Sequence, residues 1–214
     1  MGLWGYTILR TVYTKESDAL FPIAIGKLPS KMATDQKSNG SVNEELGRRF
    51  RVEVVEDKDK LNLPNLDDAT FEDIKAFRRY FDQWVVALGE DPSTAEYSTS
   101  PRLCDFLLVD SASLRSLAAL PDRTPPLCLA VDFAEKQGWQ KDGSAHVWLV
   151  DCRAVGRYDE GNRSPERRGW MKLDTCNIQD CWLIRASRLD REDWMLGCAE
   201  RPEGSGNYWY DDFF

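Results

Sequence analysis

Three short apolar runs, each ending on an aspartate, constrain the fold of this chain more than any other feature. They are Phe106–Asp110, Leu127–Asp132 and Val147–Asp151. Apolar runs of this length between turn signals are typical of strands buried on both faces of a sheet. We therefore predict that the three runs lie side by side as inner strands of one sheet. The hairpin signal Asp142-Gly143 favours antiparallel pairing of the second and third runs.

Further strands and helices are expected around this centre. The opening segment, Trp4–Tyr13, is rich in β-forming residues and predicts a first strand, after which Thr14 caps a helix. Apolar residues recur at helical spacing between Asp68 and Leu88, which predicts an amphipathic helix. Gly169–Leu173 predicts another short strand. We expect a single α+β domain over residues 1–214, with a mixed sheet of about five strands covered by helices.

Two segments before the long helix are less regular. Glu44–Leu61 fits a helix by the spacing of its large apolar residues, whereas Phe50, Val52 and Val54 alternate as in a strand. The dense charge around these residues favours the helix. Pro29–Asn43 is poor in large apolar residues and contains Gly and Ser, so it predicts a mobile surface loop.

Composition excludes several classes of function. The formal net charge of −8 and the pI near 4.8 argue against a nucleic-acid binder, which usually presents a basic face. No window approaches the roughly 18 apolar residues of a membrane span, so no membrane association is expected. The first residues do not have the pattern of a secretory signal. A cytoplasmic or nuclear location is therefore expected.

The cysteine pattern argues against a metal site. The chain has 6 cysteines and a single histidine, and no two cysteines have C-x-x-C spacing, so we predict no metal and no cofactor. Disulfides are disfavoured in a chain of this length without an export signal. Arg153 beside Cys152 is the one arrangement that could activate a thiolate, but a thiol in the core is the favoured interpretation.

The candidate catalytic residues are the three aspartates that end the apolar runs, Asp110, Asp132 and Asp151, together with the only histidine, His146. If the three runs presented the same ends, three carboxylates would converge at a sheet edge, where they could carry out acid–base chemistry. Two observations oppose this hypothesis. The hairpin signal would send Asp151 to the opposite end from Asp132, and aspartate is also an ordinary strand-end and cap residue. His146 fits the entrance of a strand better than a hydrolase triad, because no nucleophile elbow surrounds it.

Several segments together resemble a known family. Trp4–Thr14 is followed by Glu16-Ser17-Asp18, Arg48–Phe50 runs into Glu53–Asp57, and Gly169–Lys172 reads Gly-Trp-Met-Lys. This pattern resembles a family of uncharacterised filamentous-fungal (ascomycete) proteins that begin W-G-Y-T-I-x-R-T-V-Y-T. The resemblance spans most of the chain and implies a fungal-type intracellular protein. It carries over no activity and no catalytic residue.

The C-terminal tail, residues 204–214, is aromatic and acidic. Five of its last seven residues are aromatic and costly to leave in water: Tyr208, Trp209, Tyr210, Phe213 and Phe214. They are expected to fold back as an edge strand or else to dock on a protein partner or a second copy of the chain. The tail and the missing catalytic pattern favour a non-catalytic protein-interaction module. The alternative is a small-molecule enzyme, or an accessory protein of fungal metabolism, that uses the strand-end carboxylates and His146 in a cleft.

Overall fold

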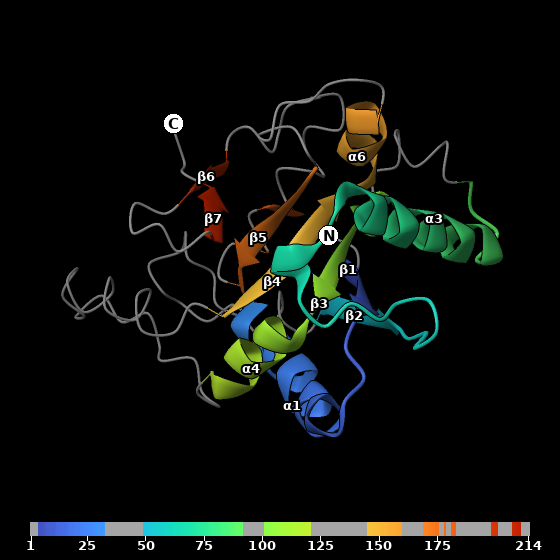
Figure 1. Cartoon of the computed structure of the whole chain (residues 1–214). Helices are drawn as coiled ribbons and strands as arrows, with labels where there is room; N and C mark the ends of the chain where they lie inside the picture. The colour runs from blue at the N-terminus through green and yellow to red at the C-terminus, as the bar shows by residue number, and fades with distance from the viewer. Residues whose placement is uncertain are drawn as a thin grey trace.

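A mixed β-sheet with helices on both faces organises the part of the chain that this computed structural model describes (Figure 1). The described residues are 4–32, 49–91, 101–120, 145–159, 169–175, 178, 181–182, 198–200 and 207–210. The strands are β1 (Trp4–Arg10), β2 (Phe50–Val55), β3 (Asp105–Val109), β4 (His146–Asp151), β5 (Trp170–Asp174), β6 (Cys198–Glu200) and β7 (Asn207–Tyr210). The α-helices are α1 (Lys15–Met32), α3 (Phe71–Ala87), α4 (Ser111–Ala119) and α6 (Cys152–Asp159), and the 3-10 helices are η1 (Leu66–Asp68) and η3 (Pro101–Leu103). The predicted α+β fold with a mixed sheet is confirmed.

The strand order is β2-β1-β3-β4-β5-β7-β6. The first three strands of this order are parallel, whereas β4 runs antiparallel to both of its neighbours, β3 and β5. The first five strands of this order, β2, β1, β3, β4 and β5, match the number expected from the sequence, and β7 and β6 extend the sheet beyond β5. The tail forms strand β7, but not at the edge, because β7 pairs with β5 on one side and with β6 on the other.

Two of the three apolar runs are the buried centre of this sheet. All residues of β3 are buried, and in β4 only His146 is partly exposed. The two strands are direct neighbours, with Leu107 opposite Leu149. The prediction is confirmed for these runs. The run Leu127–Asp132 and the hairpin signal Asp142-Gly143 lie outside the described residues.

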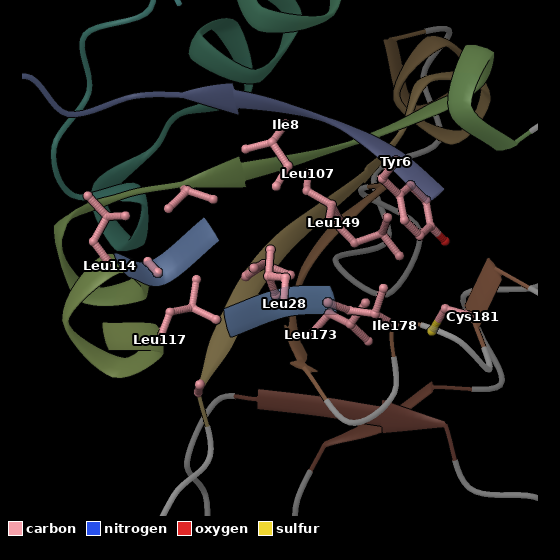
Figure 2. Packing of buried hydrophobic residues seen from close by; sticks show 14 of the residues in the cluster. Tyr6, Ile8, Leu28, Leu107, Leu114, Leu117, Leu149, Leu173, Ile178 and Cys181 are labelled. Carbon is pink, nitrogen blue, oxygen red and sulfur yellow. The ribbon is translucent and has the colours of Figure 1, made fainter. Parts of the chain in front are cut away.

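Strand alternation divides the core into two layers. On one face, Ile8, Leu107 and Leu149 pack with residues of α1 and α4, including Leu28 and Leu117, as Figure 2 shows. The opposite face carries the even-numbered apolar residues of β3 and β4, and these pack with α3 and α6. Helices cover both faces of the sheet. The inner strands are therefore apolar at every position, because each of their side chains packs against a helix layer.

Helix α3 covers the second face and follows the sequence prediction closely. Thr70 and Asp73 form a capping box at its start, and Gly89 follows its end with a φ of +83°. Its buried residues are Ile74, Phe77, Phe81 and Val85. The centroids of the Phe81 ring and the Phe106 ring of β3 are 4.8 Å apart, so the aromatic stripe packs into the core.

The structure corrects two predictions about the segments before α3. Phe50–Val55 is strand β2, not part of a helix, because Phe50 and Val52 pack on the α1–α4 face while Val55 packs on the other. The charged residues between them are tolerated because β2 is the outer strand beside β1. The mobile loop expected from Pro29 does not begin there, since α1 continues to Met32; residues 33–43 lie outside the described part.

Gly5 is required where β1 meets β2. Its φ is +144°, and a Cβ atom at this position would lie 1.8 Å from the Arg51 carbonyl oxygen. We expect Gly5→Ala to lower the free energy of unfolding by about 2 kcal/mol or more, because the clash is with backbone. Denaturant unfolding measures this loss. Gly26→Ala on the exposed side of α1 is the control, since a Cβ there meets nothing within 4 Å and should leave stability equal or slightly higher. Equal stabilities of the two variants would contradict the argument.

Candidate functional site

Asp110 lies directly after β3 and is completely buried. One carboxylate oxygen, Oδ1, accepts the N–H of Ser113 at 2.8 Å and thereby caps α4. The other, Oδ2, accepts the N–H of Leu66 at 3.0 Å and thereby holds η1 against the end of the sheet. Both oxygens of this carboxylate are thus engaged with backbone that would otherwise be buried without a partner.

His146 begins β4 at the same end of the sheet. Continuing the β3–β4 register by two residues beyond the Leu108–Trp148 pair places His146 across from Asp110. Burial lowers the pKa of the imidazole, and Lys172 lowers it further, whereas Asp110 and Asp67 act in the opposite direction. The ring is therefore neutral near pH 7. Its Nε2 atom is buried and has no hydrogen-bond partner among the described residues.

An ion pair between Lys172 and Asp67 lies beside His146. The Lys172 Nζ atom is 2.6 Å from an Asp67 carboxylate oxygen and 5.2 Å from the centre of the Trp148 ring. Lys172 comes from β5 and Asp67 from η1, so the pair ties a second strand to the same 3-10 helix that Asp110 holds. Neither residue was a candidate in the sequence, because no spacing links either of them to His146.

Asp151 lies at the opposite end of the sheet from Asp110. It is almost completely buried, stands directly across from Asp105 of β3, and accepts the backbone N–H of Arg153 at 2.8 Å. The hypothesis that the strand-end acids converge is therefore wrong for Asp110 and Asp151, because β4 runs antiparallel to β3. Asp132 lies outside the described residues.

Cys152, next to Asp151, is a buried thiol. Burial raises its pKa well above the ordinary value, and the nearby carboxylates of Asp82, Asp105 and Asp151 add to this effect. The guanidinium of Arg78 acts in the other direction but does not reverse it. This environment disfavours the thiolate form of Cys152. The favoured interpretation of Cys152 as a core residue is confirmed.

Arg10 ends β1 at the carboxyl edge of the parallel strands, where open sheets often bind ligands. The guanidinium is nearly buried and donates to the Val12 carbonyl, the Ser17 hydroxyl, Asp18 and Glu56. All three of its nitrogens are thus engaged within the chain. Arg10 therefore holds α1 and the end of β2 in place, and it is not an anion-binding residue in this arrangement.

A small cavity of about 10 Å³ lies between the starts of α1 and α4, lined by Thr14, Ser17 and Ser111 among others. It has room for about one water molecule. The ion pair of Arg115 with Glu16 is part of its wall. None of the candidate catalytic residues lines this cavity.

Neither a metal centre nor a membrane span occurs in the described ranges. Within the part of the chain that the structure describes, no group of three His, Cys, Asp or Glu side chains is arranged to hold a metal ion. None of the helices there has the length and apolar character needed to span a bilayer. Of the predicted interaction residues, Tyr208, Trp209 and Tyr210 lie in β7, and Phe213 and Phe214 lie outside the described residues.

Comparison with protein-family models, with curated proteins and with solved structures finds no match for this chain. The resemblance to filamentous-fungal proteins therefore stays a prediction.

The neutral state of His146 makes stability depend on pH. Its pKa in the folded state is below the ordinary value of 6.5, so the unfolded chain binds the proton more readily. We expect the contribution of His146 to the free energy of unfolding to be fully present above about pH 7 and to be lost as the pH decreases toward about 5. His146→Gln should remove this part of the pH dependence. Because the chain has one histidine, its single imidazole resonance reports the folded-state titration directly. A midpoint above 6.5 would contradict the assignment.

Removing the Asp110 carboxylate should break two connections at once. Asp110→Ala leaves the N–H groups of Leu66 and Ser113 buried without acceptors, so we expect a loss of about 2–4 kcal/mol in the free energy of unfolding. Thr70→Ala is the matched control, because it removes an exposed helix cap and should cost about 1 kcal/mol. Chemical denaturation compares the two variants. A loss no larger than that of Thr70→Ala would show that the two hydrogen bonds accepted by Asp110 do not stabilise the fold as argued.

Proposed function

We propose that this chain is a non-catalytic protein-interaction module. The observation that carries the proposal is the burial and hydrogen bonding of the two described candidate acids, Asp110 and Asp151. Both are buried and both accept backbone N–H groups, so neither carboxylate is presented to a substrate in solution. A general acid or base must come within hydrogen-bond reach of the proton that it transfers.

The environment of His146 supports the same conclusion. Its Nε2 atom is enclosed, and the nearby carboxylate of Asp110 is already engaged on both oxygens. A histidine that acts as a base in a triad is oriented by a third group through a hydrogen bond, and the buried Nε2 atom of His146 makes none with the described residues. Docking of a partner on the aromatic tail, residues 204–214, is part of this proposal.

One observation favours the alternative, a small-molecule enzyme or an accessory protein of fungal metabolism. Asp110 and His146 do lie at the same end of the sheet, and the charge of Asp110 acts on the imidazole. Open sheets often bind ligands at such ends.

Thermal-shift screening separates the two functions. The wild-type chain and the His146→Gln variant are compared with the same panel of divalent metal ions and small metabolites. For the interaction module we expect no compound to stabilise the wild type alone. A compound that raises the melting temperature of the wild type and not that of His146→Gln would overturn the proposal. Arg115→Gln is the control, since it changes an exposed ion pair that does not include His146.

A further inference from the structure

Strand β2 is an outer strand of the described sheet. It pairs with β1 on one side, and no other described strand lies on its far side. Such an edge presents backbone N–H and C=O groups that another strand can pair with. The strand is six residues long, Phe50–Val55, and two of its residues, Arg51 and Glu53, carry opposite charges.

The contact at Gly5 shows which residues of β2 direct their backbone N–H and C=O groups toward β1. The Arg51 carbonyl oxygen lies against Gly5, so Arg51 directs its backbone groups to β1. In a parallel pair the bonding residues alternate, so Val52 and Val54 direct theirs outward. The Phe50 carbonyl, which has the same parity, accepts a hydrogen bond from the Arg51 guanidinium at 2.9 Å. The outward set is therefore the even-numbered residues.

Charge selects one register for pairing with a second copy. An antiparallel pair about a two-fold axis at Val52 places Arg51 opposite Glu53 of the other copy, twice. An axis at Arg51 would bring two arginines together, and an axis at Glu53 would bring two glutamates together. Among the axes at positions 51, 52 and 53, the one at Val52 is centred on an outward-facing residue and pairs opposite charges.

The side chains around this axis are suited to the contact. Arg51 is exposed, and Glu53 is held by an ion pair with Arg102, so its carboxylate is fixed before pairing. On the other face of the strand, Val52 and Val54 are half-buried, and their remaining apolar surface would be covered by the second copy. Pairing would replace the Arg51 contact with the Phe50 carbonyl by a strand–strand hydrogen bond.

We infer that two copies of this chain associate through their β2 strands, antiparallel and centred on Val52, to give a sheet continuous across the dimer. This inference goes beyond the proposed function, because it names a second copy of this chain as a partner and places the contact on β2 instead of the aromatic tail. An interface of one short strand is small, so the dimer is expected to dissociate on dilution.

Two charge variants test the inference by sedimentation equilibrium and native mass spectrometry of the full chain, at concentrations up to about 500 µM. Arg51→Glu and Glu53→Lys each place like charges opposite one another in the dimer, and each should raise the dimer Kd about tenfold or more. Mixing the two variants should restore association as a heterodimer, because each contact between positions 51 and 53 across the interface then joins an acidic to a basic side chain. Thermal unfolding of each variant confirms that it is folded.

The outcomes are distinct. A monomeric wild type, single variants that dimerise as well as the wild type, or a mixture without heterodimer would each overturn the inference. The proposed function fails separately, through a ligand response that depends on His146. A monomeric chain without such a response would therefore refute the β2 dimer and leave the interaction module standing.

Discussion

The antiparallel pairing of β3 with β4 is the constraint on which the rest of this structure depends. Both strands are buried on two faces, so their ends are the places where polar side chains lie. Because the strands run in opposite directions, Asp110 and His146 meet at one end, and Asp105 and Asp151 meet at the other. The direction of one strand thus decides which polar groups act on one another.

Much of the fold follows from local patterns in the sequence. The apolar runs of β3 and β4 admit few alternatives to buried strands, and the stripe of α3 together with its capping box fixes that helix and its start. Phe50–Val55 is the informative failure. Its alternating apolar residues fit a strand, but the charges between them favour a helix unless the position of β2 outside β1 is known. Whether a charged residue is tolerated in a strand depends on strand order, which is a tertiary property.

The candidate site was less predictable for a related reason. The sequence singled out Asp110 and His146, but their proximity depends on the direction of β4. Lys172 and Asp67 were missed because they reach His146 from other elements, β5 and η1. Asp105 carried a signal that was available, since it directly precedes the same apolar run that Asp110 ends. In an antiparallel pair, the acid at the start of one strand is the natural neighbour of the acid at the end of the next.

The roles of the buried acids also bear on what the chain can evolve to do. To act as a catalytic base, Asp110 would have to take up a proton, which removes the negative charge that accepts the N–H groups of Leu66 and Ser113. A buried donor that loses its partner costs about 1–3 kcal/mol. That cost is a large share of the stability of a typical domain. The Asp110 carboxylate at this end of the sheet therefore contributes to the stability of the fold. Arg51 of the outer strand β2, by contrast, is exposed, and β2 is the strand at which we propose that a second copy pairs.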